Sequence, residues 1–210
     1  MGIDDSAGRD ESVRPPFEIA AETITAFNRE GKGASFEELA LVNEVRRVMN
    51  RMPEGKSGVV LGSGPNTDLW RSRGWKTLDI DQAVGADFTL NANWLEAISL
   101  LIGKQDFILV EYIRMDPKGI DGVHWVRLLD QARRILKLGG VVSIISGAFE
   151  NNPRSTLPQR KWYGNKMAQS GFNAVVEMER KIDDGSGQTE QRVVYHGRKV
   201  AETFDASRGR

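Results

Sequence analysis

The strongest constraint on the fold is a series of alternating strands and helices that finishes in two closely linked strands. Residues 172–182 and 189–200 have strand character, and the turn Asp183-Asp184-Gly185-Ser186-Gly187 lies between them. Strands joined this closely must be antiparallel, because a parallel pair needs a crossover of a dozen or more residues. The alternation before them predicts a parallel sheet. We therefore predict an α/β fold with a doubly wound, mostly parallel seven-stranded sheet that ends in an antiparallel hairpin.

Apolar runs and glycine-rich breaks divide the rest of the chain into elements. Short apolar runs predict the earlier strands at 58–61, 76–80, 87–90, 106–113 and 141–146. Helical spacing of apolar residues predicts the helices between and after them at 67–73, 94–102, 121–137 and 161–170. Two extra N-terminal helices are predicted at 17–30 and 35–52. Disordered tails are expected at 1–16 and 203–210, with one domain over 17–202.

Composition excludes several function classes. The chain has no cysteine, so disulfides, thiolate metal sites and a cysteine nucleophile are excluded, and we expect no metal. Lys and Arg total 29 and Asp and Glu total 29, so net charge gives no evidence for nucleic-acid binding. No apolar run reaches the roughly 20 residues that cross a bilayer, and the N-terminus does not resemble a signal peptide. We expect a cytoplasmic protein without membrane attachment.

A glycine turn and an acidic residue mark a candidate ligand site. The turn Gly62-Ser63-Gly64-Pro65-Asn66 links a strand to a helix, at the sheet edge where open α/β folds bind ligands. Asp79 ends the next strand, near the spacing at which an acid reaches a ribose diol, and Asp81 is a second candidate. The alternative is a plain structural turn, with one or both acids capping the turn that follows.

The third glycine of the dinucleotide-binding fingerprint is absent, because Asn66 stands at its position. A ligand without a pyrophosphate relaxes the need for that glycine, and S-adenosylmethionine is such a ligand. The segments GVVLGSGPN, GWKTLDID, ADFTLNANWL, QDFILVEYI and ARRILKLGG follow one another in the chain. This series resembles the ordered motifs of class I (Rossmann-like) S-adenosylmethionine-dependent methyltransferases. It is most similar to small bacterial enzymes of that family.

The resemblance implies roles for particular residues, with S-adenosylmethionine as cofactor and S-adenosylhomocysteine as product. Gly62 and Gly64 would line the methionine end, and Asp79 would hold the ribose hydroxyls. Asn91 and Ala92 would contact the adenine, and Glu111 would lie beside the methyl-transfer centre. The remaining expected cofactor contacts are Ser63, Asn66 and Ile80. Val60 stands where the family commonly has an acid, Asn91 stands where it usually has Asp, and Leu138 replaces the usual Pro.

Methyl transfer is a direct displacement, so the protein mainly positions the reactants and needs a base only for a protonated acceptor. His124 and Glu111 are the candidate catalytic groups, although His124 also fits a helix-start position. Acceptor recognition is expected from 112–125 and 147–163, which leave the ligand edge of the sheet. A small-molecule acceptor is favoured, with protein or RNA left open.

Two other functions remain open at this point. A methyltransferase-like binding or regulatory protein without catalysis fits the departures at Val60 and Asn91. An NAD(P)-dependent oxidoreductase shares the fold and the acid after the second strand. The short-chain type of oxidoreductase needs Tyr and Lys four residues apart, whereas Tyr163 and Lys166 are three apart. The sequence does not indicate an oligomeric state.

Overall fold

The computed structural model describes residues 20–25, 48, 55–111, 113, 115–116, 122–145, 157–182 and 189–201. The predicted tails at 1–16 and 203–210 lie outside these residues, as does the predicted helix at 35–52 apart from Val48. Val48 is helical and buried. The limits of the single domain, 17–202, stay a prediction.

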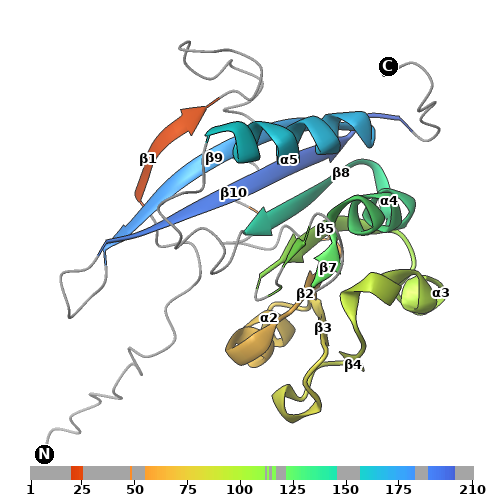
Figure 1. The fold of residues 1–210 in the computed structure, drawn as a ribbon. Helices are drawn as coiled ribbons and strands as arrows, with labels where there is room; N and C mark the ends of the chain where they lie inside the picture. The colour runs from red at the N-terminus through yellow and green to blue at the C-terminus, as the bar shows by residue number, and fades with distance from the viewer. Residues whose placement is uncertain are drawn as a thin grey trace, which may run out of the picture.

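Eight of the described strands form one mixed sheet with the order β1-β9-β10-β8-β5-β2-β3-β4. The strands are β1 (Ala20–Thr25), β2 (Gly58–Leu61), β3 (Lys76–Asp79), β4 (Phe88–Thr89), β5 (Gln105–Val110), β8 (Leu136–Ile145), β9 (Phe172–Ile182) and β10 (Thr189–Lys199). Neighbours from β4 to β8 pair in parallel, whereas β10 is antiparallel to both β8 and β9. The predicted parallel sheet ending in an antiparallel hairpin is confirmed, and Figure 1 shows the long hairpin at one side of the sheet.

The strand order places the switch point of the sheet at β2. From β2 the chain adds β3 and β4 on one side, and it then returns to add β5 and β8 on the other. Because these strands are parallel, their carboxyl ends meet at one edge, and the crevice at the reversal is where such sheets bind ligands. The glycine turn that follows Leu61 lies at this point.

The N-terminal helix predicted at 17–30 is wrong where the structure describes it, because residues 20–25 form β1. This strand pairs antiparallel with β9, with Ala20 opposite Arg180 and Thr25 opposite Val176. Spacing of apolar residues suggests a helix, but Thr23, Ile24 and Thr25 are consecutive β-branched residues that favour a strand. The edge of β9 also offers unpaired backbone groups that a strand can satisfy. β1 therefore adds an eighth strand to the seven that the sequence predicts.

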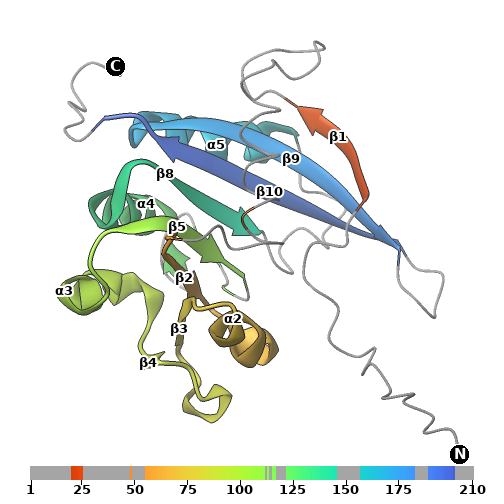
Figure 2. The ribbon, with the colours of Figure 1, turned by 180° about the vertical axis from the view of Figure 1, so that it is seen from behind.

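Helices cover both faces of the sheet. They are α2 (Thr67–Ser72), α3 (Ser99–Ile102), α4 (Trp125–Ile135) and α5 (Leu157–Gln169), with short 3-10 segments η1 (Gly64–Asn66), η2 (Gln82–Val84) and η3 (Ala92–Ile98). Figures 1 and 2, seen from opposite sides, show α5 lying along one face of β9 and β10. No helix within the described part of the chain is long and apolar enough to cross a membrane.

Buried side chains alternate between two cores, one on each face of the sheet. Val59 and Leu61 join the core under η3, α4 and α5, whereas Val60 joins the core that contains Trp70 and Val48. The same alternation holds along β5, where Ile108 and Val110 face the first core and Phe107 and Leu109 face the second. Strands buried on both faces are expected for a parallel sheet covered by helices.

Three predicted helices differ from the structure, and the one predicted at 161–170 begins earlier, as α5 (Leu157–Gln169). The helix predicted at 94–102 is split into η3 and α3, with non-helical dihedral angles at Trp94. The helix predicted at 121–137 spans only Trp125–Ile135, because the backbone becomes extended at Leu136 and β8 begins there. Before α4, the two-residue strands β6 (Met115–Asp116) and β7 (Val123–His124) pair in parallel.

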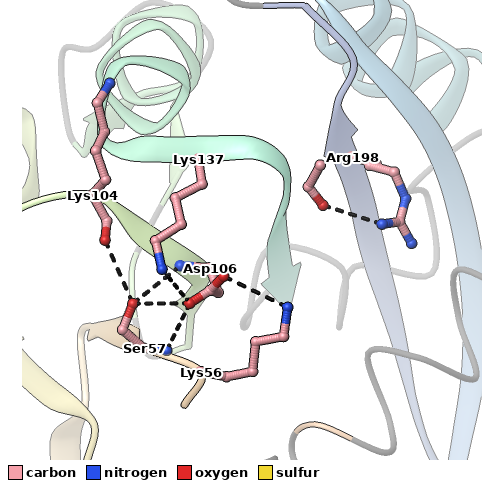
Figure 3. Close-up of polar contacts among 7 residues, drawn as sticks. Lys56, Ser57, Lys104, Asp106, Lys137 and Arg198 are labelled. Atoms are coloured by element: carbon pink, nitrogen blue, oxygen red, sulfur yellow. Dashed lines mark hydrogen bonds and ion pairs between the residues drawn. The ribbon is translucent and has the colours of Figure 1, made fainter.

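A charged cluster links the amino end of β5 to the residues just before β2 and to the start of β8, as Figure 3 shows. The carboxylate of Asp106 accepts hydrogen bonds from the Ser57 backbone N–H at 2.9 Å and the Ser57 hydroxyl at 3.1 Å. Lys137 Nζ donates to it at 2.8 Å, and Lys56 Nζ lies 3.7 Å away. Burial raises the pKa of Asp106, but the hydrogen bonds from Lys137 and Ser57 outweigh burial and hold this pKa below its ordinary value.

Candidate functional site

The turn after β2 needs both of its glycines. Gly62 has φ +67° and Gly64 has φ +47°, in the left-handed region that side chains disfavour. The Gly62 and Ser63 N–H groups donate to the Leu78 carbonyl at 2.7 and 3.3 Å, which holds the turn against β3. The positive φ angles of the backbone therefore explain why glycine occupies both positions.

Ser63 and Asn66 take part in the internal structure of this turn. The Ser63 side chain is fully buried, and its Oγ lies 2.7 Å from Thr67 Oγ1, which in turn donates to the Gly64 carbonyl at 2.9 Å. Asn66 is 8% exposed, and its N–H donates to the Ser63 carbonyl. Since the Ser63 hydroxyl is used within the turn, a ligand contact of Ser63 would come through its backbone.

Asp79 joins the glycine turn to the turn after β3. Its Oδ2 accepts the Gly64 N–H at 2.8 Å, and its Oδ1 accepts the Asp81 N–H at 3.0 Å. The residue is only 7% exposed. A carboxylate has about four lone-pair sites, so after these two bonds it retains the capacity to accept two more. That capacity equals the two hydroxyls of a ribose diol.

The two residues that follow Asp79 have different surroundings. Ile80 is 68% exposed, which is unusual for a large apolar side chain directly after a buried strand. It offers an exposed apolar surface one residue after Asp79 in the chain. Asp81, the second candidate for ribose, accepts the Ala83 N–H at 2.9 Å and caps η2. The capping role that the sequence left open for Asp81 is thus the role it has here.

Asn91 and Ala92 follow β4 beside the end of β3. The Leu90 N–H donates to the Asp79 carbonyl at 2.8 Å, so this segment is tied to the strand that carries the predicted ribose acid. Asn91 Oδ1 accepts the Asn93 N–H at 2.9 Å and caps η3. Asn91 is half-buried and Ala92 is buried.

Glu111 follows β5 and directs its carboxylate toward α2. Its Oε2 accepts a hydrogen bond from Trp70 Nε1 at 2.7 Å, and the residue is 5% exposed. Burial lowers the pKa of the nearby Arg73 guanidinium, and the negative charge of Glu111 opposes this shift. Trp70 was not identified from the sequence, although a carboxylate after a fully buried strand must find donors. The Glu111 carboxylate is therefore buried beside Trp70, in the core that contains Trp70 and Val48, and is not exposed to solvent.

His124 is the N-cap of α4. Its Nδ1 accepts the Arg127 N–H at 3.2 Å, and its own N–H donates to Asn93 Oδ1 at 2.9 Å. With Nδ1 accepting, the proton of the neutral ring is assigned to Nε2. This arrangement matches the helix-start interpretation of His124 and leaves Nε2 as a donor. Its predicted role as a base stays a prediction.

Most of the predicted site residues are linked through hydrogen bonds. The glycine turn contacts Asp79, β3 contacts the segment after β4, and Asn93 connects that segment to His124. The Glu111 N–H donates to the Leu61 carbonyl directly before the turn. Among the described residues, no group of His, Asp or Glu side chains has the arrangement of a metal site.

No protein-family model matches the sequence, and no curated protein matches it. Solved structures match the fold. An S-adenosylmethionine-dependent methyltransferase from Archaeoglobus fulgidus is 14% identical, with 80% of this chain and 95% of that chain covered and a TM-score of 0.51. A spermidine synthase in complex with the transition-state analogue AdoDATO is 15% identical, with coverage of 75% and 58% and a TM-score of 0.50.

A second spermidine synthase, from Thermotoga maritima, is 13% identical, with 75% of this chain covered and a TM-score of 0.47. The chain spans 56% and 58% of the length of these two synthases. At such low identities the likeness is one of fold. Together with the strand order and the glycine turn at its switch point, the likeness to the methyltransferase shows that this chain has the class I fold of S-adenosylmethionine-dependent methyltransferases.

Proposed function

We propose that this protein binds S-adenosylmethionine and transfers its methyl group to a small-molecule acceptor. The observation that carries the proposal is the Asp79 carboxylate, which is held by two backbone N–H groups and keeps acceptor capacity for two hydroxyls. It lies at the switch point of the sheet, next to two glycines with positive φ. The Asp79 carboxylate suits the hydroxyls of a ribose, and the glycine turn suits a polar group joined to that ribose without a pyrophosphate.

In this proposal each part of the site has one role. Asp79 accepts hydrogen bonds from the ribose hydroxyls, and the backbone at Gly62 and Gly64 lies against the methionine end. Ile80 offers its exposed apolar side chain to one face of the adenine, while Asn91 and Ala92 face its edge. When bound, the cofactor supplies an electrophilic methyl group, and displacement by the acceptor leaves S-adenosylhomocysteine.

Glu111 supports the cationic part of the proposed ligand. Residues alternate in facing along a strand, so Glu111 faces the same core as Leu109 and Val60. Val60 stands where related enzymes commonly have an acid for the cofactor's amino group. Glu111 brings a negative charge to that face of the sheet from the neighbouring strand, which favours a ligand with an ammonium group nearby.

The proposal of a small-molecule acceptor follows from the net charge of the chain and the place of the site in the fold. Net charge is zero, which gives no electrostatic attraction to nucleic acid over the whole chain. A small molecule then fits best with a ligand site at the carboxyl edge of an open parallel sheet. The fold itself does not settle the reaction, since a spermidine synthase has it as well.

The test is calorimetric titration of the purified protein with S-adenosylmethionine, S-adenosylhomocysteine, NAD and NADP. Both sulfur compounds are expected to bind, and Asp79→Ala is expected to weaken binding about 10²–10⁴-fold. That range follows from two hydrogen bonds to a charged group at about 1.5–3 kcal/mol each. Asp130→Ala, which removes an exposed carboxylate from α4, serves as the matched control and should bind like the wild type.

Thermal unfolding of each variant without ligand separates loss of binding from loss of folding, because Asp79 also holds the Gly64 N–H. Binding of NAD or NADP in place of the sulfur compounds would replace this proposal with an oxidoreductase. Binding of none of the four ligands would refute it. Turnover is then sought with a panel of small-molecule acceptors, by detection of S-adenosylhomocysteine.

A further inference from the structure

Asn93 connects two segments at the ligand edge of the sheet through hydrogen bonds of its side chain and its backbone. Its Oδ1 accepts the His124 N–H at 2.9 Å, and its Nδ2 donates to the Gly122 carbonyl at 3.4 Å. Its backbone N–H donates to Asn91 Oδ1 at 2.9 Å. One residue thus contacts both the segment after β4 and the segment that leads into α4.

Gln131 completes this connection from α4. The side chain is 3% exposed, and its Nε2 donates to the Asn93 carbonyl at 2.8 Å while its Oε1 accepts the Glu96 N–H at 2.8 Å. A buried amide with both ends bonded is costly to disturb, because a buried donor or acceptor left without a partner is destabilising. Gln131 therefore fixes η3 on α4.

Trp94 makes a further contact between the same two elements. The Arg127 guanidinium lies over the Trp94 ring, 4.4 Å from its centroid. The segment after β4 is thus attached to α4 by Gln131 and the Arg127–Trp94 contact, and to the residues just before α4 by the Asn93 amide. These contacts make it difficult for one segment to shift without the other.

We infer that Asn93 is a positioning residue that transmits cofactor binding at Asn91 to the segment 122–124 on the acceptor side. This inference rests on the proposed function, which assigns Asn91 to the adenine. The Asn93 backbone N–H donates to Asn91 Oδ1, so fixing Asn91 against a ligand also fixes the backbone that carries the Asn93 side chain. Asn93 in turn holds the His124 N–H, at the end of the connection that runs from β5 to α4.

If Asn93 had a purely structural role, its contacts would be the same, but they would not become stronger when ligand binds. In that case Asn93 would hold η3 on α4 to the same extent with and without cofactor. Under our inference, the His124 amide becomes harder to open when the cofactor site is filled. Because a bound ligand also slows amides that exchange through global unfolding, the two roles are distinguished by comparing the exchange rate of that amide in the wild type and in Asn93→Ala.

The experiment is hydrogen exchange of the full chain with and without saturating S-adenosylhomocysteine, resolved at the His124 amide. In the wild type, exchange there is expected to slow by about tenfold or more, with a limit of roughly 100-fold at about 100 times Kd. Asn93→Ala should lose this response, while the amides of Gly64 and Asp81 beside Asp79 still respond. Asn93→Asp keeps the oxygen that accepts from His124 and should retain the response.

Asn173→Ala, an exposed asparagine on β9, is the matched control and should behave as the wild type does. The inference is overturned if the wild type binds S-adenosylhomocysteine and exchange at His124 does not change, a result that needs no variant to fold. It is also overturned if Asn93→Ala keeps the response. If the wild type does not bind S-adenosylhomocysteine at all, the proposed function fails and this inference fails with it.

Discussion

Replacing Asp106 with asparagine tests the strength of the charged cluster at the amino end of β5. The Asp106 side chain is 12% exposed and accepts hydrogen bonds from the Ser57 N–H, the Ser57 hydroxyl and Lys137 Nζ. Asparagine has the same shape but no charge, and one of its two polar atoms becomes a donor. The substitution therefore removes the ion pair and brings a donor toward groups that already donate.

The expected loss follows from these contacts. A hydrogen bond to a charged group contributes about 1.5–3 kcal/mol, but Lys137 is 46% exposed and regains water when it is released. We therefore expect the free energy of unfolding to fall by about 2 kcal/mol at pH 7. The control is Asp130→Asn, which breaks a pair with Arg134 in which both side chains are about half exposed. Such pairs contribute about 0.5 kcal/mol or less.

The pH dependence has a definite sign. The folded-state pKa of Asp106 lies below its unfolded value, which is about 3.9. Its contribution is therefore fully present above the unfolded pKa and is lost as the pH falls through the lower, folded pKa. The difference in stability between wild type and Asp106→Asn should be constant from neutral pH down to about pH 5 and should shrink below about pH 4.

Urea unfolding at several pH values measures both quantities. Equal losses for Asp106→Asn and Asp130→Asn at pH 7 would show that the cluster is no stronger than an exposed ion pair. A difference between wild type and Asp106→Asn that grows on acidification would mean that folding raises the pKa of Asp106 instead of lowering it. Either result would contradict the stabilising role assigned to the hydrogen bonds of Asp106.

Two further predictions concern a packed glycine and the candidate base. Gly58→Ala should destabilise the protein by about 1–3 kcal/mol in urea unfolding, because a Cβ there would lie 2.5–2.7 Å from ring atoms of the buried Trp75; a neutral effect would mean that the Trp75 ring moves easily. His124→Ala should cost about 0.5–2 kcal/mol through loss of the helix cap, and His124→Asn should restore most of it, since asparagine is a good N-cap. If turnover is found, activity that survives in His124→Asn contradicts the role of His124 as a base, whereas a loss in both variants contradicts a role limited to capping.

Local patterns in the sequence predict most of the sheet. The strands at 58–61, 76–80, 172–182 and 189–200 lie within one residue of the observed β2, β3, β9 and β10. At 58–61 this information lies in a short apolar run before a glycine turn, because burial on both faces leaves no polar alternation. At 172–182 and 189–200 it lies in the glycine-containing turn between two segments of strand character. The turn at Gly62 and Gly64 is predictable for a related reason, since its positive φ values favour glycine.

The sequence also places Asp79, Asn91 and Glu111 at strand ends, because parallel strands share one carboxyl edge. It does not give the partners of these side chains. Trp70 bonds Glu111 across 41 residues, and Asn93 and Gln131 meet across 38. Contacts at such separations depend on which helices lie side by side, and no local pattern specifies that.

The segment Ala20–Thr25 shows the same limit for secondary structure. Its apolar spacing suits a helix and its β-branched residues suit a strand, so the local sequence is ambiguous. In the folded protein it is β1, because β9 has an open edge whose backbone groups it pairs with. Periodicity and backbone conformation, both local properties, are enough to specify the parallel sheet, its terminal hairpin and the glycine turn. The strand that covers the sheet edge and the side chains that meet at the site are set by the packing of the whole chain, because they depend on neighbours that are distant in the sequence.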